Sequence, residues 1–568
     1  MYSDKEIVNT ITALLLSKGV THAVLCPGSR NIPIVANLCE ADAIRCHAVT
    51  DERSAGFYAL GLALATGEPV VVCVTSGSAL LNVAPAVCEA YYRHVPLIVV
   101  SADRPKHWID RNDGQTIRQA GALANFIKAQ ADVEEIADTD TVRQNMQQLI
   151  LNKTLNEAMM GDKGPVHINV HIDDPLFSFS TSQLPAVKNI TAIQSTDALP
   201  AEAAEVIDRF MASVRKMIVI GQLPRHDRRT DALVRELRRH FVVVSECLSS
   251  AVGLPADRIV TSFMHDDKDT AIDFVISLGG NFIGKNIKRF LRSRHVTEHW
   301  EVNCSGLIHD TFLSQTGIIQ TDPIAFLTAL CERAKPTSVS ETNNENAADA
   351  QRFLNSWNDA VRLTQQAIDE YDPKFSQLSA IREMEMSLED MDYDFHVHYA
   401  NSMAVRVGSL YASHYVWCNR GVNGIEGSLS MAAGFSLATT DRVFCVIGDL
   451  SFFYDQNALW NAELKGNFRI LLINNSAGGI FSQLNGLNLS AETMRFVAGE
   501  HKTNARGICE QNDIGYLSAH NQQELQQNMA FFLTEETTRP MLLEVFTTAD
   551  DDKREFEALV KLQKSMRR

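Results

Sequence analysis

Short runs of apolar, mostly β-branched residues recur along this chain and alternate with segments of helical periodicity. Residues 22–26 and 70–74 are two such runs, and residues 52–65 form an apolar helical segment between them. The same alternation returns within residues 217–277 and within residues 415–473. Continuous apolar strands separated by helices are typical of parallel sheets with helices on both faces. The pattern therefore predicts an α/β protein made of three doubly wound parallel sheets.

The length of the chain supports several domains. At 568 residues it exceeds the size of about 250–300 residues at which a single core stops growing. Two polar stretches separate the alternating blocks. We predict an α/β domain at residues 1–175, a linker at 176–195, a central α/β domain at 196–335, a second linker at 336–348 and a third α/β domain at 349–568.

The charge balance limits the partners of the chain. Its 69 acidic residues against 52 Lys and Arg give a formal net charge of −17, which argues against a general nucleic-acid or anionic-membrane surface. No uncharged apolar span of about 20 residues occurs, and the N-terminus lacks the pattern of a signal peptide. The eleven cysteines form no C-x-x-C pair, which favours free thiols in a reducing compartment. We expect a cytoplasmic protein without membrane insertion.

Polar turns follow two neighbouring strands of the third block. The strand ending at Ile447 runs into residues 448–451, and the next strand runs into residues 474–479. Parallel strands joined by a right-handed crossover present their carboxyl ends at the same edge of a sheet. Asp449 and Asn475 are therefore expected to face one another across one crevice.

These two turns carry the ligands of a metal–diphosphate site. The Asp449 carboxylate, the Asn475 amide oxygen and a backbone carbonyl near Ala477 suit Mg²⁺ when phosphate oxygens complete its coordination. The turn at Gly448 leads to a helix that we expect to begin near Asp455, and a helix N-terminus favours a diphosphate. The alternative is a pair of ordinary turns with Asp449 as a capping residue.

The first block offers a second set of polar turns. Glu52 opens its apolar helix, and residues 26–30 (Cys-Pro-Gly-Ser-Arg) and 75–78 (Thr-Ser-Gly-Ser) also follow strands. The plain interpretation of Glu52 is an acid that the helix N-terminus favours. Convergence of three polar turns at one sheet edge favours a binding site instead.

Glu52 after a strand in one block and Gly-Asp with Asn-Asn in another resemble the thiamin diphosphate-dependent enzymes. The likeness spans all three blocks. It is closest to the members of menaquinone biosynthesis, and Leu450 stands where most of the family has a small residue. The segments that carry the resemblance are residues 26–30, 51–56, 75–77, 102–105, 401–406, 419–421 and 448–455.

The resemblance implies a transferase that decarboxylates 2-oxoglutarate and adds the succinyl-type fragment to isochorismate. It also implies thiamin diphosphate and Mg²⁺, with Mn²⁺ as a substitute, and a homodimer or homotetramer with active sites at the subunit interface. The implied metal ligands are Asp449, Asn475 and Ala477. The implied cofactor-binding residues are Glu52, Thr75, Ser76, Gly77, Asn82, Ile425, Gly448, Asp449, Leu450, Ser451, Asn475, Ala477, Gly478, Ile480 and Phe481.

Within this resemblance, Glu52 would hydrogen-bond the aminopyrimidine ring and Ile425 would bend the cofactor, although the local pattern around Ile425 is also that of a core residue. Both substrates are dicarboxylates, which require cations in forked geometry. The sequence departs from its relatives at Asn286, where a Lys-Arg pair becomes Lys-Asn. The implied catalytic and substrate residues are Glu52, Ser29, Arg30, Arg104, Gln115, Ser402, Arg406, Arg420 and Lys285.

Three alternatives stay open at this point. A thiamin diphosphate enzyme acting on pyruvate or oxalyl substrates would carry the same cofactor motifs, and so would a non-catalytic paralogue that binds the cofactor. A nicotinamide-dependent dehydrogenase is disfavoured because no G-x-G-x-x-G follows a strand.

Overall fold

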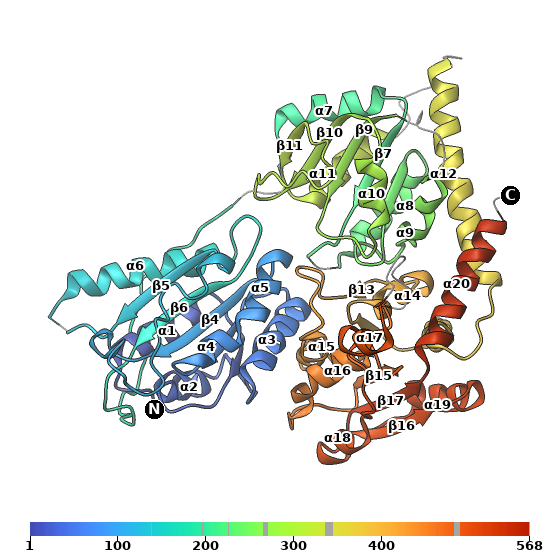
Figure 1. The fold of residues 1–568 in the computed structure, drawn as a ribbon. Helices are drawn as coiled ribbons and strands as arrows, with labels where there is room; N and C mark the ends of the chain where they lie inside the picture. Colours follow the sequence, from blue (N-terminus) through green and yellow to red (C-terminus); the bar gives the residue numbers. More distant parts are fainter. Residues whose placement is uncertain are drawn as a thin grey trace.

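The computed structural model describes residues 1–137, 139–194, 198–224, 226–264, 271–334, 345–481 and 489–566. Three sheets follow one another along the chain, and every strand pairing within them is parallel. Figure 1 shows the three units, with helices on both faces of each sheet. The predicted fold class is thereby confirmed. Residue 195 and residues 336–344 of the two predicted linkers lie outside the described residues.

The first sheet has the strand order β2-β1-β3-β4-β6-β5. Its strands are β1 (His22–Leu25), β2 (Arg45–Ala48), β3 (Val70–Val74), β4 (Leu97–Asp103), β5 (Ala129–Glu134) and β6 (Val166–His171). Its helices are α1 (Glu6–Ser17), α2 (Ile32–Glu40), α3 (Glu52–Thr66), α4 (Ser78–Asn82), α5 (Ala84–Arg93), η1 (Lys106–Trp108), η2 (Ala124–Phe126) and α6 (Thr141–Glu157). The β3 and β4 strands are buried along their whole length, as the apolar sequence of β3 and the apolar first four residues of β4 predict.

The second sheet has the order β11-β10-β9-β7-β8. Its strands are β7 (Lys216–Ile220), β8 (Val242–Ser245), β9 (Ile272–Leu278), β10 (Val296–Asn303) and β11 (Gly317–Gln320). Its helices are α7 (Ala201–Ala212), α8 (Arg228–Arg238), α9 (Ala256–Ile259), η3 (Val260–Ser262), α10 (Asn286–Arg292) and α11 (Pro323–Ala334).

The third sheet has the order β13-β12-β14-β15-β17-β16. Its strands are β12 (Phe395–Tyr399), β13 (Val416–Trp417), β14 (Arg442–Gly448), β15 (Phe468–Asn474), β16 (Gly515–Ala519) and β17 (Met541–Phe546). Its helices are α13 (Gln377–Glu389), α14 (Met403–Tyr411), α15 (Ser428–Ser436), α16 (Asp449–Tyr454), η4 (Gln456–Leu459), α17 (Ala491–Ala498), α18 (Arg506–Gln511), α19 (Gln522–Thr534) and α20 (Ala549–Ser565).

The helix expected to begin near Asp455 begins six residues earlier. Asp449 is the first residue of α16, which ends at Tyr454, and Asp455 lies between α16 and the short helix η4. The prediction of this boundary was wrong because the Phe452 side chain is buried in the core. This apolar contact supports a helical turn directly after the strand.

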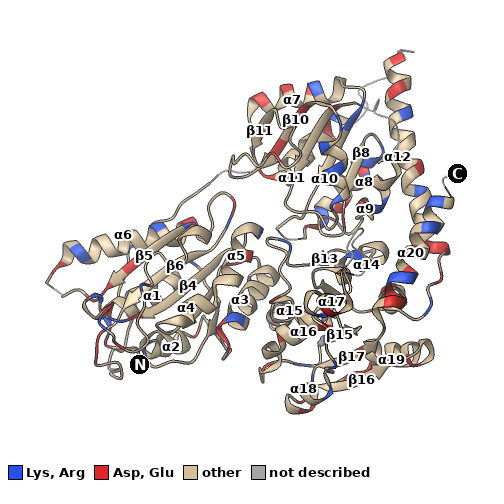
Figure 2. Cartoon of the chain, viewed as in Figure 1, with Lys and Arg blue, Asp and Glu red and all other residues tan. Residues whose placement is uncertain are grey.

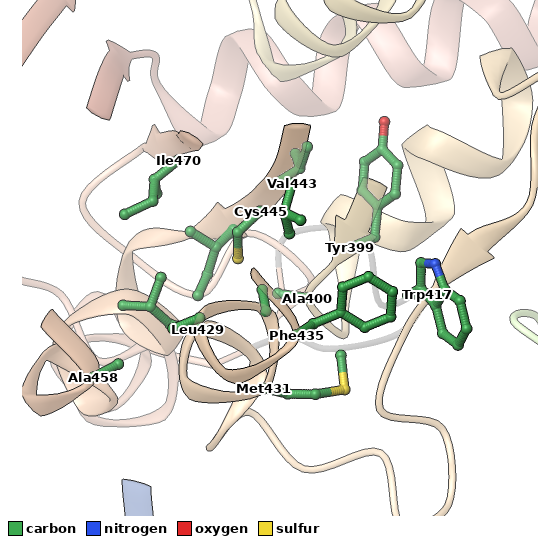
Figure 3. Packing of buried hydrophobic residues seen from close by; sticks show 14 of the residues in the cluster. Tyr399, Ala400, Trp417, Leu429, Met431, Phe435, Val443, Cys445, Ala458 and Ile470 are labelled. Carbon is green, nitrogen blue, oxygen red and sulfur yellow. The ribbon is translucent and has the colours of Figure 1, made fainter. Parts of the chain in front are cut away.

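Helices α3 and α15 join the first unit to the third. They pack so closely that a Cβ atom on Gly61 would lie 2.0 Å from the Met431 carbonyl oxygen, and one on Gly434 would lie 2.3 Å from the Tyr58 carbonyl oxygen. Glycine at both crossing points therefore permits backbone-to-backbone contact. Figure 3 shows Phe435 of α15 beside Trp417 of β13. Leu429 and Phe435 belong to one buried core with Val443 and Cys445 of β14 and the apolar residues of α3.

A long helix, α12 (Glu345–Glu370), runs beside α20 and joins the second unit to the third (Figure 1). Figure 2 shows charged residues of both signs along α12 and α20, whereas the strands of the sheets are largely uncharged. Trp357 of α12 is buried against the second unit, where it stacks on Phe263 with ring centroids 4.4 Å apart. Among the described helices, none combines the length and apolar character that crossing a bilayer requires.

Replacing Gly61 by alanine is expected to destabilise the protein. The new methyl group meets the backbone of α15, so the helices must separate, which costs about 1–3 kcal/mol of unfolding free energy. The thermal unfolding midpoint measures this loss. Gly507→Ala in α18 is the matched control, because a Cβ atom there meets nothing within 4 Å. Equal midpoints for the two variants would contradict the close packing of α3 and α15.

Candidate active site

The turns after β14 and β15 lie side by side, as predicted. Gly448 pairs with Ile473 in the parallel ladder, so both strands end at the same edge. The Asp449 side chain is buried; its Oδ1 accepts a hydrogen bond from the Leu450 amide at 2.7 Å and its Oδ2 accepts one from the Asn475 amide at 3.1 Å. The structure therefore brings the two residues of the predicted metal site into direct contact.

The pKa of the Asp449 carboxyl is raised by burial, while backbone amides and the nearby His501 ring oppose that shift. The His501 Nε2 atom lies 3.3 Å from Asp449 Oδ2. No motif in the sequence marks His501, which comes from the segment after α17. Its ring contacts Phe453 edge to face, with ring centroids 5.3 Å apart.

The Asn475 amide is oriented by its neighbours. Its Nδ2 donates to Asp552 Oδ2 at 2.9 Å, and its Oδ1 accepts from the Ala477 amide at 3.3 Å. Ser476 takes the left-handed conformation of this turn, with φ of 64°. The positive φ of the turn thus falls on Ser476 and not on Ala477, whose carbonyl stays suitable as a ligand.

The surroundings of this turn fit a diphosphate and a hard cation. A Cβ atom on Gly448 would meet nothing within 4 Å, so the space beside this turn is open. Carboxylate, amide and carbonyl oxygens make up the donor set, which is the chemistry that Mg²⁺ takes from proteins. Gly478 donates its amide to the Ala498 carbonyl at 2.7 Å, and Phe481 donates to Gly478 at 3.1 Å. Leu450, Ile480 and Phe481 are half-buried around the turn.

Ile425 lies on the same edge of the third unit. Its side chain is 44% exposed, so the interpretation of Ile425 as a core residue is wrong. Its carbonyl accepts a short hydrogen bond from the hydroxyl of Ser451, the fourth residue of the Gly448 turn. An exposed isoleucine with an anchored backbone is available to contact a ligand.

Glu52 is the first residue of α3 and is half-buried. Its Oε2 accepts a hydrogen bond from Asn82 Nδ2 at 3.1 Å, which joins two of the predicted cofactor residues. Asp51 caps α3 by accepting from the Arg53 and Ser54 amides. Asp51 is thus the capping residue, and Glu52 lies in the first turn of α3 as the acid that the helix N-terminus favours.

The neighbours of Glu52 bind the third unit of the same chain. Asn457 Nδ2 donates to Asp51 Oδ2 at 2.7 Å, and Arg53 donates to the Tyr454 carbonyl at 2.6 Å. Within the described part of the chain, no hydrogen bond or ion pair joins Glu52 to Asp449 or Asn475. The Glu52 region is thus bound to the third unit of its own chain, but Glu52 itself does not contact the Asp449 turn.

The turn after β3 holds Thr75, Ser76 and Gly77, all buried. Gly77 has φ of 85°, and a Cβ atom there would lie 3.2 Å from the Gln115 backbone. The Gly77 amide donates to Gln119 Oε1 at 2.7 Å, and Gln119 Nε2 donates to the Ala102 carbonyl at 3.1 Å. Gln119 was missed because no motif marks it.

Two of the predicted arginines share one end of the first sheet. Arg30 is buried and donates to the Ile172 carbonyl at 3.0 Å. The pKa of Arg30 is lowered mainly by burial, and the positive charge of Arg104 lowers it further. Arg104 is half-exposed beside Asp113, with Nε 3.4 Å from Oδ2. Ser29 and Gln115 are exposed at the same edge.

The other two arginines lie where the second and third units meet. Burial lowers the pKa of Arg406, and the positive charge of Arg420 lowers it further. The negative charges of Asp257 and Glu246 raise the pKa and so oppose this shift. Arg420 is buried; it donates to Asn401 Oδ1 at 3.0 Å and to the Phe282 carbonyl at 2.6 Å. The structure therefore brings the four arginines together as two pairs. Ser402 precedes α14, with φ of 72°.

Lys285 and Asn286 have different environments. Lys285 is exposed just before α10, whereas Asn286 donates its amide and its side chain to Asp257 at 2.8 and 3.0 Å. Asn286 is neutral and leaves the charge of Asp257 in place, and that charge raises the pKa of Arg406. Lys288, which could compensate for the missing arginine, donates to Asn281 Oδ1 at 2.9 Å.

A large cavity of about 1530 Å³ lies between the first and second units. Arg420, Gly421 and Lys288 are part of its wall, but Glu52 and Asp449 are not. The cavity therefore borders Arg420 but contains neither Glu52 nor Asp449, the residues assigned to the two ends of the cofactor.

Comparison with known proteins finds family matches over both regions that carry these polar turns. Residues 6–122 match the family described as thiamine pyrophosphate enzyme, N-terminal TPP binding domain. Residues 400–545 match the corresponding C-terminal TPP binding domain. The first range includes Glu52 and the Gly77 turn, and the second includes Asp449 and Asn475.

Several relatives that match over nearly the whole chain share one name. The chain is 38% identical over 568 residues to 2-succinyl-5-enolpyruvyl-6-hydroxy-3-cyclohexene-1-carboxylate synthase of Phocaeicola vulgatus, a match that covers 97% of each chain. It is 37% identical to the synthase of Bacteroides thetaiotaomicron over 98% of each chain. The synthase of Porphyromonas gingivalis is 35% identical over 96% of this chain and 95% of its own.

The chain belongs to this synthase family. Membership confirms the prediction of a thiamin diphosphate-dependent enzyme of the transferase type. The roles of individual site residues in this member of the synthase family stay predictions.

In this member of the synthase family, the buried residue Asp455 joins the end of α16 to the start of α15. Asp455 is fully buried and accepts hydrogen bonds from the Ser430 amide at 2.8 Å and the Ser430 hydroxyl at 2.6 Å. Burial raises the pKa of Asp455 to about 6, although the bonds from Ser430 and the charge of Arg53 oppose the shift. Asp455 therefore holds a proton in the folded state at pH values where the unfolded chain has lost it.

This raised pKa predicts a pH-dependent stability. Because the folded state binds the proton more tightly, unfolding free energy falls as the pH rises from about 4 to about 6, by about 3 kcal/mol in total. The amide in Asp455→Asn cannot ionise, so the stability of wild type relative to this variant should decline over that range. Urea unfolding midpoints at several pH values measure the decline. Asp42→Asn, an exposed position, controls for the loss of charge, and a difference independent of pH would contradict the assignment.

Proposed function

We propose that this chain decarboxylates 2-oxoglutarate and adds the succinyl-type fragment to isochorismate, in menaquinone biosynthesis. The observation that supports this specificity is the pairing of arginines at two sheet edges. Arg30 and Arg104 follow strands of the first sheet, and Arg406 and Arg420 lie near the ends of strands of the third. Both substrates carry two carboxylates, which guanidinium groups bind in forked geometry.

Glu52 is the proposed proton-handling residue. Thiamin diphosphate supplies the electron sink for loss of CO₂ when it is bound. The Glu52 carboxyl would hydrogen-bond the ring nitrogen of the aminopyrimidine and hold or release a proton at that atom. Asn82 fixes the carboxyl by its bond to Oε2, which supports this geometry. Thr75, Ser76 and Gly77 would line the same end of the cofactor, and Ser29, Gln115 and Ser402 would hydrogen-bond substrate.

Asp449, Asn475 and the Ala477 carbonyl are the proposed ligands of Mg²⁺ or Mn²⁺. Their contact and the orientation of the Asn475 amide by Asp552 support this role. Gly448, Leu450 and Ser451 would bind the diphosphate, with Gly478, Ile480 and Phe481 beside it. Ile425 is exposed where it would contact the cofactor, and Lys285 is exposed where it would reach a substrate carboxylate.

We also propose that the enzyme is a homodimer or homotetramer in the cytoplasm. Residues 1–175 of one copy would bind the pyrimidine end of a cofactor whose diphosphate end is held by residues 349–568 of another copy. The attachment of Glu52's neighbours to Tyr454 and Asn457, away from Asp449 at the other end of α16, supports a site shared between copies. The exposed side chains of Tyr454 and Trp460 nearby provide apolar surface for such contact.

The reaction is tested by mixing purified enzyme, thiamin diphosphate and Mg²⁺ with 2-oxoglutarate and isochorismate, and following the loss of isochorismate absorbance. Turnover that requires both substrates is expected. Turnover with pyruvate in place of 2-oxoglutarate would favour another carboligase of the same cofactor class. Cofactor binding without any turnover would favour a non-catalytic paralogue.

Glu52→Gln is expected to bind thiamin diphosphate but to lose at least about 10²-fold in kcat, because the amide cannot transfer the proton. Cofactor binding is read from quenching of tryptophan fluorescence and turnover from the absorbance assay. Glu68→Gln, an exposed glutamate of the same unit, is the matched control. An unchanged kcat in Glu52→Gln would remove Glu52 from its proposed role.

Asp449→Asn is expected to weaken Mn²⁺ binding by about 10-fold or more, because a neutral amide replaces the charged ligand. Electron paramagnetic resonance of free Mn²⁺, titrated with protein and thiamin diphosphate, measures the affinity without turnover. Asp513→Asn in the same unit is the control, since it removes an exposed carboxylate that pairs with Arg539. Equal Mn²⁺ affinity in wild type and Asp449→Asn would place the metal elsewhere.

A further inference from the structure

The segment 418–424 of the third unit is held by residues of all three units. Gln222 of the second unit donates to the Cys418 carbonyl at 2.9 Å, and Asn281 donates to the Arg420 carbonyl at 2.9 Å. Asn401 of the third unit donates to the Gly424 carbonyl at 2.7 Å. This segment carries Arg420 and leads directly to Ile425, so its backbone position decides where both side chains lie.

The first unit contributes a buried carboxylate to this arrangement. Glu89 of α5 is 3% exposed, and its two oxygens accept from two successive backbone amides. Oε1 accepts from the Gly421 amide at 2.8 Å, and Oε2 accepts from the Val422 amide at 2.8 Å. A carboxylate that receives two backbone N–H groups makes charge-assisted bonds, which are about twice as strong as neutral ones.

The closeness of α5 to the segment leaves little freedom. A Cβ atom on Gly421 would lie 2.7 Å from the Glu89 carbonyl oxygen and 3.0 Å from Oε2. Arg93, one turn later on α5, points Nη1 to Asn419 Oδ1 at 3.4 Å. The α5 helix thus contacts the residues on both sides of Arg420.

The opposite face of Arg420 is equally constrained. Its Nη2 donates to the carbonyls of Phe282 and Ile283 at 2.6 and 3.1 Å, and its Nη1 donates to Asn401 Oδ1. The Arg420 side chain is therefore aimed by the second and third units, while its backbone is pinned by the first. Arg420 Nε has no hydrogen-bond partner among the described residues, although it is buried. Protein acceptors in the described part of the chain thus take up part of the guanidinium and leave its Nε–H unpaired.

We propose that Glu89 is a positioning residue for Arg420: by binding the Gly421 and Val422 amides, its carboxylate fixes the segment that presents Arg420 to a carboxylate substrate. The inference rests on the proposed function, because it assigns Arg420 a substrate. Glu89 touches neither substrate nor cofactor and acts through the backbone that follows Arg420. Burial raises the pKa of Glu89, and Arg93, the two amides and Arg420 oppose that shift.

The test compares Glu89→Gln with wild type, both with thiamin diphosphate and Mg²⁺. Glutamine keeps the shape but turns one acceptor into a donor facing a backbone N–H. We expect kcat/KM for 2-oxoglutarate or isochorismate to fall by at least about 10-fold, with thiamin diphosphate affinity within about twofold of wild type. Glu68→Gln is the matched control for the same chemical change at the surface.

A double-mutant cycle with Arg420→Ala separates positioning from general stability. If Glu89 acts through Arg420, the double variant should be within about twofold of Arg420→Ala alone, because the interaction is already lost. Multiplying losses would overturn the inference, and so would an unchanged kcat/KM in Glu89→Gln. If Glu89→Gln does not fold, Glu89→Asp is read by the same criteria, since it keeps the charge but shortens the reach.

The wild-type rate separates the two proposals. Turnover in wild type with an unaffected Glu89→Gln would contradict only the positioning role. No turnover in wild type with both substrates would contradict the proposed function and remove the basis of the inference with it.

Discussion

The contact between α3 and α15 is the constraint on which the rest of the structure depends. Backbone meets backbone at Gly61 and Gly434, so the first and third sheets cannot shift relative to one another without losing a shared apolar core. Glu52 opens α3, and Ile425 lies three residues before α15. Close packing of the two helices therefore fixes where Glu52 and Ile425 of one chain lie relative to one another, so that each is held in place for the site it is proposed to share with another copy.

Buried carboxylates that accept hydrogen bonds from backbone amides fix the backbone in a similar way around the candidate active site. Asp449 binds the amides of Leu450 and Asn475, Asp455 binds that of Ser430, and Glu89 binds those of Gly421 and Val422. In each case a carboxylate fixes a turn at the end of a strand or the start of a helix. Such groups cost free energy to bury, and they specify one backbone conformation in return.

The three parallel sheets, the polar turns and the family could be predicted from the sequence, because apolar periodicity and turn motifs are local properties. The neighbouring positions of Asp449 and Asn475 could also be predicted, since parallel topology places the ends of adjacent strands together. The start of α16 and the exposure of Ile425 could not. Glu89, Gln119, His501 and Asp552 were missed because each acts on a residue far away in the chain, and only the tertiary structure brings them together.

Each active site is proposed to combine Glu52 of one copy with the Asp449 turn of another. The most direct test mixes Glu52→Gln and Asp449→Asn subunits after dissociation and reassembly, at a Mg²⁺ concentration low enough that each variant alone is inactive. Random pairing gives heterodimers in which one site has both native residues, so about a quarter of the wild-type rate is predicted to return. If each site is built within a single chain, the mixture stays inactive, and that result would contradict the shared site.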